Sequence, residues 1–181
     1  MKGLFVFSHD MEDVEALGTR ALLKRAGLTV DAVTYEKSKK VKTAYGLTVE
    51  ADYLGEDINP DAYDFLIIPG GPYVAKVIKK DVKIKRLILA FSKQNKLIAA
   101  ICAGPRFFGQ LHLLDKHRFT CYPGSEKDMP QGIYLPEEKA VTDKHIITAR
   151  GAGCVYDFSY HIVNYTLGKN DADHLFEAIQ Y

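Results

Sequence analysis

The sequence has no tryptophan and only three cysteines among its 181 residues. Cys102, Cys121 and Cys154 are odd in number and far apart, so they form neither a disulfide framework nor a CxxC metal site. Such sparse use of cysteine is typical of a reducing compartment. We therefore expect a cytoplasmic protein that binds no metal.

The chain also lacks an excess of charge of either sign and has no long apolar run. Lys and Arg number 24 against 23 Asp and Glu, a net charge of +1, which provides no general footprint for nucleic acid or an anionic membrane. The first apolar run soon meets His9 and Asp10, so we expect no signal peptide. No run approaches the roughly 20 apolar residues of a membrane span, so we expect a soluble protein without membrane partners.

Nucleotide-binding motifs are missing as well. The pair Gly70-Gly71 follows an apolar run but lacks the G-x-G-x-x-G spacing, and no Walker motif occurs in the chain. We therefore expect no nucleotide cofactor.

What the sequence does contain is a regular alternation of short apolar runs and segments with helical periodicity. Strands are predicted at 4–8, 28–35, 41–44, 47–51, 65–68, 97–101, 119–122, 132–135, 140–142 and 146–149, and helices at 11–26, 73–80, 82–94, 103–113, 155–167 and 171–179. This alternation predicts one α/β domain over residues 1–181, a mainly parallel sheet with helices on both faces.

Cys102 stands at one of the transitions from strand to helix. It closes the apolar run 97–101 and is followed by Ala103, Gly104 and Pro105, which places the thiol at a sharp turn. Unpaired N–H groups and the dipole of the following helix favour negative charge, so we expect a lowered thiol pKa and a reactive thiolate. The alternative is a buried structural cysteine.

A carboxylate falls on the apolar stripe of the first predicted helix. The stripe comprises Met11, Val14, Gly18, Ala21, Leu22 and Arg25, whereas Thr19 is expected to point elsewhere. Glu15 lies within the stripe, and a buried carboxyl has a raised pKa unless it is paired. If Glu15 meets Cys102, it can donate a hydrogen bond to the thiolate or transfer a proton. The alternative is a pair with Arg20 or Arg150, or a place at the wet edge of the stripe.

Asp10 and Asp13, three residues apart, resemble a capping pair at the start of this helix. We therefore expect them to hold the helix start and to have no catalytic role.

Several chemically active segments directly follow predicted strands. They are Ser8-His9, Pro69-Gly70-Gly71, Cys102 and Arg150-Gly151. In open α/β sheets the ligand crevice lies beyond the carboxyl ends of the strands. We therefore expect these segments to line one shared crevice.

Four segments together closely resemble the DJ-1/ThiJ/PfpI superfamily, in order and over nearly the whole chain. They are Glu15 after the first strand, Leu66-Ile67-Ile68-Pro69-Gly70-Gly71, Ile98-Ala99-Ala100-Ile101-Cys102-Ala103-Gly104-Pro105 and Thr148-Ala149-Arg150-Gly151-Ala152-Gly153. The most specific element is A-A-I-C-A-G-P, and the end of the first helix, residues 24–27, is similar to the DJ-1 branch.

This resemblance implies a flavodoxin-like three-layer sandwich and a homodimer, with Cys102 on a strained nucleophile elbow and Glu15 as its protonated partner. Gly70, Gly71 and Ala103 would supply backbone donors around the thiolate. The implied activity needs no cofactor and is that of a glyoxalase or deglycase acting on 2-oxoaldehydes such as methylglyoxal. The alternative is a non-enzymatic oxidative-stress sensor or chaperone whose cysteine oxidises to a sulfinate.

The chain departs from the family pattern at two positions. Ala103 stands where protease-like relatives carry a histidine, so peptidase activity is not expected. Tyr122, before Pro123, stands where the DJ-1 branch places a catalytic histidine, and tyrosine is a poor base near neutrality. His9 is the candidate to replace that base, the alternative being a solvated loop histidine.

Two arginines and the two other cysteines complete the candidates. Arg106 is a candidate for attracting an anionic or carbonyl substrate, the alternative being a surface salt bridge. Arg150 belongs to the expected crevice and is a second candidate for the substrate pocket. Cys121 is a candidate resolving thiol or else a buried strand residue, and Cys154 is expected to be inert.

Overall fold

The computed structural model describes all 181 residues, and its main feature is a seven-stranded sheet in the order β10-β11-β7-β6-β1-β2-β5. The strands are β1 (Lys2–Phe7), β2 (Thr29–Thr34), β5 (Tyr53–Leu54), β6 (Phe65–Ile68), β7 (Leu97–Ile101), β10 (Ala140–Asp143) and β11 (Ile146–Ala149). Every neighbouring pair is parallel except β10 and β11. The predicted mainly parallel sheet is confirmed.

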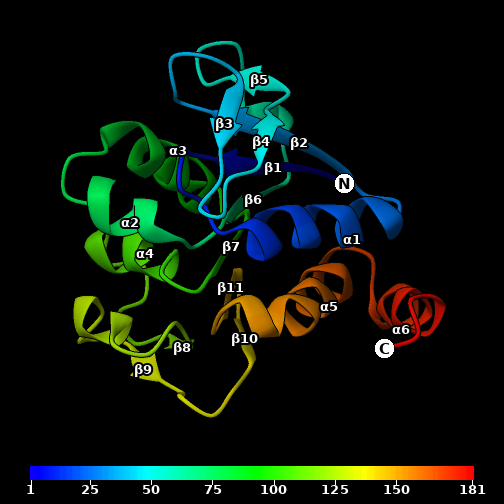
Figure 1. Cartoon of the computed structure of the whole chain (residues 1–181). Coiled ribbons are helices and arrows are strands. Elements are labelled where there is room, and N and C mark those ends of the chain that lie inside the picture. Colours follow the sequence, from blue (N-terminus) through cyan, green and yellow to red (C-terminus); the bar gives the residue numbers. More distant parts are fainter.

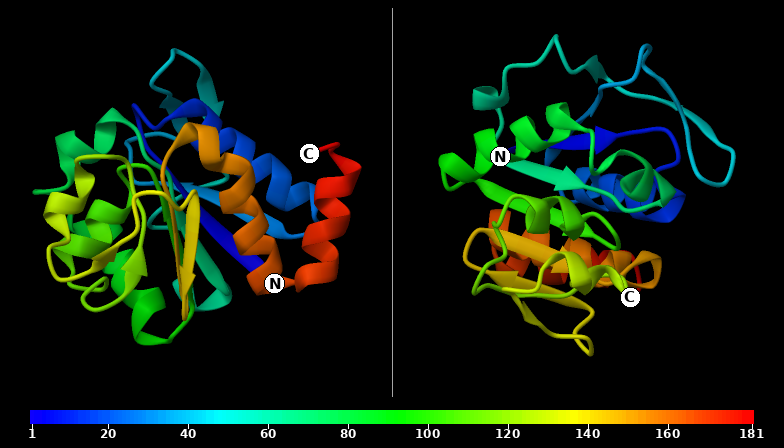
Figure 2. Two further views of the ribbon diagram at one scale, coloured as in Figure 1. Left: turned by 90° about the horizontal axis from the view of Figure 1, so that it is seen from below. Right: turned by 90° about the vertical axis from the view of Figure 1, so that its left-hand side faces the viewer.

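Helices cover both faces of this sheet, as Figures 1 and 2 show. One face carries α1 (Thr19–Arg25), α5 (Val155–Thr166) and α6 (Lys169–Ala178), and the other carries α2 (Pro72–Val77), α3 (Val82–Lys93) and α4 (Pro105–Gln110). The three layers are clearest in the left panel of Figure 2, where the strands lie between the two groups of helices. The flavodoxin-like three-layer sandwich is therefore confirmed.

Two small sheets and four short helical turns complete the fold. The sheets pair β3 (Lys40–Lys42) with β4 (Thr48–Glu50), and β8 (Arg118–Phe119) with β9 (Ile133–Tyr134). The turns are η1 (Val14–Gly18), η2 (Pro60–Ala62), η3 (Ser125–Asp128) and η4 (Ala152–Cys154). The predicted hairpin is present, whereas β5 was not predicted, and the strand predicted at 119–122 ends at Phe119.

The hydrophobic core lies on both sides of the central strands. All residues of β6 and β7 are buried, because helices cover both faces of a parallel sheet. This explains why their sequences read as continuous apolar runs. No helix in the structure has the length and apolar character that crossing a bilayer requires.

The first helix differs from its prediction. It begins at Val14 with a π-helical turn, η1, which continues directly into α1. A π turn accommodates an extra residue and thereby rotates the following residues around the helix axis. Consequently Glu15, Thr19 and Leu23 are buried together, whereas Ala21 is exposed like Val14. The predicted apolar stripe was wrong at these positions, although Glu15 is buried as expected.

The predicted capping role of Asp10 and Asp13 was also wrong. The Asp13 carboxylate accepts a hydrogen bond from the Thr43 hydroxyl (2.6 Å) and so fastens the β3–β4 turn to the helix start. Asp10 forms an exposed ion pair with a lysine of α2. The helix start is held instead by the carboxylate of Glu12, which accepts from the Glu15 amide over 2.7 Å.

Candidate functional site

The carboxyl ends of four neighbouring strands, β11, β7, β6 and β1, meet at one edge of the sheet. Each end leads into one of the segments expected to share a crevice. The topology therefore brings Cys102, Gly70 and the start of the first helix together, although they are far apart in sequence.

Cys102 lies directly after β7 in a left-handed backbone conformation, with φ of 62°. Its amide donates to the Ala149 carbonyl of β11 (2.9 Å), and its carbonyl accepts from the Tyr122 amide (2.9 Å). These bonds hold a conformation that costs a non-glycine residue free energy. Gly104 completes the turn, because a Cβ there would lie 2.8 Å from the Ile68 carbonyl oxygen. The thiol thus stands on a strained strand-to-helix elbow.

Glu15 reaches the elbow from the π-helical turn and is only 1% exposed. Its carboxyl group lies beside the Cys102 thiol, close enough for the charge of Glu15 to raise the pKa of the thiol. Gly70 lies against both, because a Cβ there would come within 2.5 Å of Cys102 Cβ and of Glu15 Oε2. The predicted pairing with Arg20 or Arg150 does not occur, since the former binds Asp52 and the latter a backbone carbonyl.

Backbone amides surround this acid and thiol on two sides. The Gly70 amide donates to Glu15 Oε2 (2.9 Å), and the Ala152 amide lies close enough to this carboxyl group to lower its pKa. The amides of Gly71 and Ala103 face the sulfur of Cys102. Gly70 was expected to donate to the thiolate, but its single N–H is directed to the acid instead.

Burial dominates the electrostatics of the pair. It raises the pKa of Glu15 from its ordinary 4.5 to about 7, against the hydrogen bonds that the carboxyl group accepts. Burial, followed by the charge of Glu15, also raises the pKa of the Cys102 thiol. The expected lowering of this pKa was wrong, because α4 has only six residues and the loss of water outweighs its dipole.

Glu15 is the group of the pair that ionises near neutral pH. Its pKa of about 7 lies below that of the thiol, which is raised by burial and by the charge of Glu15. The thiol therefore keeps its proton when Glu15 is charged. The ionised carboxyl group can accept that proton as the sulfur attacks a carbonyl group, while the amides of Gly71 and Ala103 face the sulfur.

Tyr122 lies at the mouth of the site with 55% of its surface exposed. A Cβ at Gly151 would lie 3.6 Å from its ring and 4.0 Å from Glu15 Oε1, so the ring and the acid flank the same glycine. The residue at the expected position of the family histidine is therefore near Glu15. Its backbone, through the bond to Cys102, also fixes the elbow.

The other polar candidates have partners outside the pair. His9 accepts from the Lys42 amide through Nδ1 (2.9 Å) and lies beside Glu36. Arg106 forms an ion pair with Asp128 (2.6 Å), which is the alternative considered from its sequence. Arg150 donates to the carbonyl of Pro136 (3.2 Å). None of the three contacts Glu15 or Cys102 through a hydrogen bond.

The remaining cysteines are buried. Cys121 is fully inaccessible, and burial raises the pKa of its thiol to about 12. Cys154 is buried at the turn that precedes α5. Histidine, cysteine and acidic side chains form no group of three that can hold a metal ion.

Two further groups belong to the site that sequence reasoning did not identify. Tyr73 is buried, and its hydroxyl donates a hydrogen bond to the Pro69 carbonyl (2.9 Å). It lies close enough to Glu15 and Cys102 for their charges, in addition to burial, to raise its pKa. Ala152 contributes an amide that lies close enough to Glu15 to lower the pKa of its carboxyl group. Tyr73 had no chemical signature, and Ala152 was visible only as part of the family motif 148–153.

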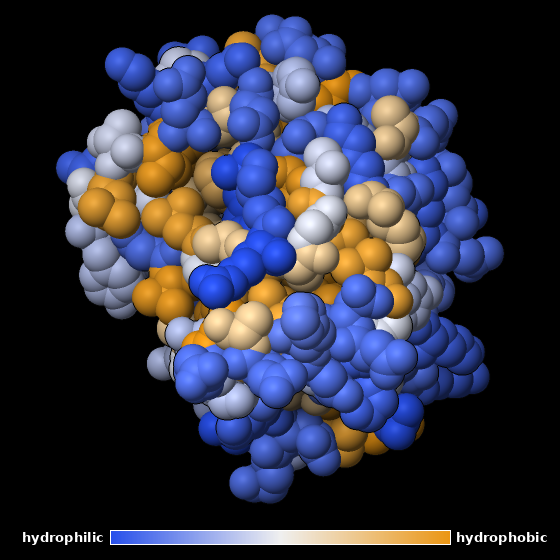
Figure 3. All heavy atoms as spheres, turned by 90° about the vertical axis from the view of Figure 1, so that its right-hand side faces the viewer, coloured by the Kyte–Doolittle hydropathy of each residue, from blue (hydrophilic) through white to orange (hydrophobic).

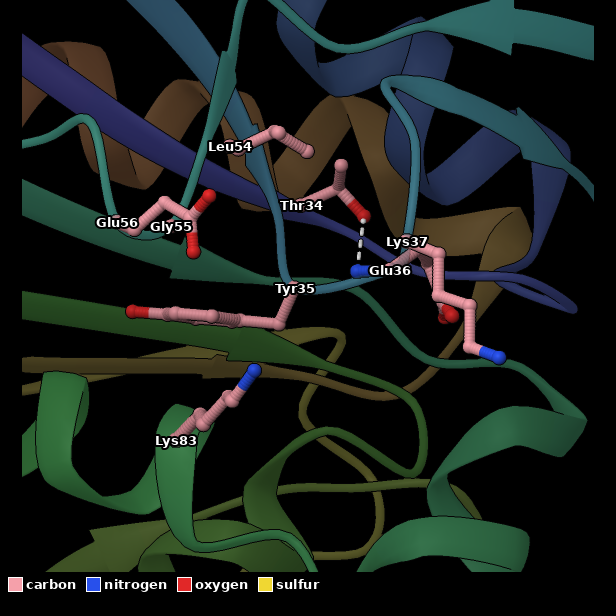
Figure 4. Close-up of a pocket in the computed structure, with 8 residues that line it drawn as sticks. All are labelled: Thr34, Tyr35, Glu36, Lys37, Leu54, Gly55, Glu56 and Lys83. Atoms are coloured by element: carbon pink, nitrogen blue, oxygen red, sulfur yellow. Dashed lines mark hydrogen bonds between the residues drawn. The ribbon is translucent and has the colours of Figure 1, made fainter.

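Two cavities lie outside this site. One of about 450 Å³ and one of about 400 Å³ adjoin along the ends of β1, β2 and β5, and neither is lined by Cys102 or Glu15. In Figure 4, the ring of Tyr35 in the first cavity lies between Gly55 and Lys83.

Comparison with known proteins places this geometry in context. The DJ-1/PfpI family profile matches residues 1–165. Glutathione-independent glyoxalase DJR-1.2 of Caenorhabditis elegans is 31% identical over 172 residues, which cover 94% of this chain and 90% of the relative. Deglycase PfpI of Pyrococcus furiosus is 30% identical over 159 residues, which cover 86% of this chain and 93% of the relative.

Other relatives are longer. Protein DJ-1 homolog B of Arabidopsis thaliana is 30% identical over 94% of this chain, but the match spans only 39% of the plant protein, and the next plant relative is spanned to 44%. Among solved structures, oxidized DJ-1 of Toxoplasma gondii superposes with a TM-score of 0.92 at 27% identity, covering 99% of this chain and 98% of the other. This chain belongs to the DJ-1/PfpI family.

Proposed function

We propose that this protein is a cofactor-independent glyoxalase or deglycase that acts on 2-oxoaldehydes such as methylglyoxal. The observation that carries the proposal is the buried pair of neighbouring side chains Cys102 and Glu15, with the thiol on a strained elbow and the acid ionising near neutral pH. A nucleophile beside a group that both accepts and donates protons is the arrangement that covalent carbonyl chemistry requires.

The proposed reaction adds one water to the oxoaldehyde and yields a 2-hydroxy acid. The Cys102 sulfur forms a bond to the aldehyde carbon, whose oxygen takes up a proton, giving a hemithioacetal. Glu15 removes the proton from this carbon while the neighbouring carbonyl oxygen takes up a proton, which gives an enediol. Glu15 then returns its proton to the neighbouring carbon while the hydroxyl group on the sulfur-bearing carbon loses its proton, which leaves the thioester of the 2-hydroxy acid. Water then breaks the carbon–sulfur bond, releasing the hydroxy acid and restoring the thiol.

In this proposal, Glu15 performs both proton transfers at carbon. Tyrosine has an ordinary pKa of about 10 and is a poor base near neutrality, so Tyr122 is proposed to line the substrate pocket. A pKa of about 7 suits a group that must act in turn as base and acid. The names of the nematode and archaeal relatives support this reaction class.

The test is to incubate purified protein with methylglyoxal and to quantify lactate. We expect lactate from the wild type and from Cys121→Ser, a matched change at a buried cysteine outside the pair. We expect no lactate above background from Cys102→Ser or Glu15→Gln. Equal lactate formation by wild type and Cys102→Ser would overturn the proposal.

A second candidate function is a redox sensor in which Cys102 oxidises to a sulfinate. Its support is that Gly71 and Ala103 point their amides at the sulfur, where they can also bind sulfinate oxygens. A solved relative is itself described as oxidized. Each step to the sulfinate transfers one peroxide oxygen to sulfur and releases water or hydroxide.

Mass spectrometry after mild peroxide treatment tests this second candidate. We expect a gain of two oxygens on the peptide with Cys102, before any change at Cys121 or Cys154. Earlier oxidation of either of those two buried cysteines contradicts the sensor.

We further propose a cytoplasmic homodimer. Three exposed apolar side chains, Val14, Tyr45 and Leu47, support an interface at the β3–β4 turn. The Asp13 carboxylate binds the Tyr45 amide (3.0 Å), so this turn packs beside the helix residue that precedes Val14. Exposed apolar groups gathered in this way are typical of protein–protein contacts.

A further inference from the structure

A third cavity, of distinct chemistry, lies between α5 and α6, outside the Cys102 site. It measures about 270 Å³ and is lined by Asp157, Tyr160, His161, Phe176 and Tyr181. The two helices are packed against each other, and apolar residues are exposed on the side of the molecule that carries α6 (Figure 3). No residue of this cavity takes part in the proposed reaction.

Aromatic rings form most of its wall. Tyr160 meets Phe176 edge to face with centroids 5.2 Å apart, and Phe176 meets Tyr181 in the same way at 5.4 Å. Tyr156 stacks on Tyr181 at 4.8 Å, behind the cavity. An aromatic ring carries partial negative charge on its π face, which attracts a cation placed over it. This wall attracts a positive charge that has little hydration of its own.

A carboxylate with an unused oxygen completes the cavity. Oδ2 of Asp157 is buried and has no hydrogen-bond partner, whereas Oδ1 faces the exposed Lys139 ammonium at 3.6 Å. A buried acceptor without a partner is costly, and each one in a native structure requires an explanation. The one cation beside this carboxylate is Lys139 at 3.6 Å, so a second cation in the cavity would still be attracted by the charge of Asp157.

The groups around Asp157 leave room for that cation. His161 binds the Thr142 hydroxyl through Nδ1 (2.8 Å), and burial lowers its pKa, so it adds no positive charge at neutral pH. Lys139 is 59% exposed and is the one competing cation at the rim. An inorganic metal ion does not fit, because no group of three metal-ligating side chains exists.

We propose that this cavity binds a quaternary ammonium group, either on a free small molecule or on a trimethylated lysine side chain. Such a group donates no N–H bond, so it needs π faces for its methyl groups and a nearby carboxylate for its charge. The tyrosines, Phe176 and Asp157 provide both. Hydrated or primary ammonium ions lose more hydration on entering and are expected to bind more weakly.

Choline is the probe, and 3,3-dimethylbutanol, its neutral isostere, is the matched control. Titration of the full-length protein, followed by NMR shifts of α5 and α6 signals, should show saturable choline binding at millimolar concentrations, up to about 50 mM, and at least about tenfold weaker binding of the isostere. Equal binding of both compounds overturns the proposal, because it shows that the cavity recognises the apolar shape and not the positive charge. Absence of choline-dependent shifts overturns it as well.

Variants assign the binding to the named groups. Asp157→Asn should weaken choline binding about fivefold or more, and Tyr160→Leu by about threefold. Tyr160→Phe keeps the ring and removes only a hydroxyl that donates to Asp173, so it should bind choline like the wild type. Lys139→Met removes the competing cation and should tighten binding. The choline-to-isostere comparison on the wild type decides the proposal even if a variant fails to fold.

A pair of peptides separates the two sources of the ligand. A trimethyllysine peptide that binds more tightly than choline, while its unmodified counterpart does not bind, identifies a modified protein partner. Choline binding without peptide binding identifies a small-molecule ligand. The binding experiments can fail independently of the proposed reaction, because the cavity does not contain Cys102. We therefore expect Cys102→Ser to abolish lactate formation and to leave choline binding unchanged.

Discussion

The Gly70 amide donates a 2.9 Å hydrogen bond to Oε2 of Glu15, and the same glycine lies against the Cβ of Cys102. Gly70 thus lies between the Glu15 carboxyl group and the backbone of the elbow, and its lack of a side chain allows the two to approach each other. The close approach of acid and thiol depends on this single position.

A Gly70→Ala substitution should destabilise the protein and separate the pair. Its Cβ would come within 2.5 Å of Cys102 Cβ, which is held by the elbow backbone and cannot rotate away. We expect a loss of about 1–3 kcal/mol in the free energy of unfolding, the usual range for overpacking. Gly153→Ala is the matched control, because no atom lies within 4 Å of its Cβ. Equal denaturant midpoints for the two variants would contradict the packing argument.

The stability of the protein should fall as the pH rises from about 4.5 to about 7. Burial raises the pKa of Glu15 in the folded state to about 7 from 4.5, so the folded state favours the protonated acid. The contribution of Glu15 to the free energy of unfolding is complete below pH 4.5 and is lost as the pH rises through 7. A difference of about 2.5 in the pKa, at about 1.4 kcal/mol per pKa unit, corresponds to about 3.5 kcal/mol of unfolding free energy.

Urea unfolding at several pH values, with Glu15→Gln as the control, measures this effect. The variant carries no ionisable group at position 15, so the difference in unfolding free energy between it and the wild type isolates the acid. A difference that stays constant from pH 4.5 to 7.5 would show that the acid ionises normally.

The fold was predictable because its signals are local. Residues 65–68 and 97–101 are continuous apolar runs, and such runs between helical segments specify buried parallel strands. The π turn at 14–18 was not predictable in this way. Helical periodicity assumes 3.6 residues per turn, so the positions of Thr19 and Ala21 were assigned to the wrong faces.

The site was predictable only in part for a related reason. The residues around Cys102 predict the strand-to-helix turn, and Glu15 is recognisable as a carboxylate among apolar neighbours. Its electrostatics depend on burial by distant segments, which no local pattern records. The expected effect of the helix dipole on the thiol pKa was therefore outweighed by desolvation.

Leu47→Glu should convert the proposed homodimer to a monomer. Leu47 is 52% exposed beside Tyr45 and Val14, so a buried interface there would not accept a charge. Val82→Glu is a matched control, since Val82 is 54% exposed on α3 on the opposite face of the sheet. Light scattering should give twice the chain mass of 20.3 kDa for the wild type and control, and 20.3 kDa for Leu47→Glu. A monomeric wild type would refute this interface.

Tyr122→His should raise the rate of lactate formation from methylglyoxal. The Tyr122 ring and Glu15 flank the same glycine, Gly151, so an imidazole at position 122 would enter the site as a second base. Its ordinary pKa of about 6.5 suits proton transfer near neutrality, and such groups contribute about 10²-fold or more. The gain should disappear as the pH falls below the imidazole pKa, because the protonated ring cannot accept a proton. Tyr122→Phe separates loss of the hydroxyl from gain of the base, and a histidine variant no faster than the phenylalanine variant would show that Glu15 already performs every proton transfer.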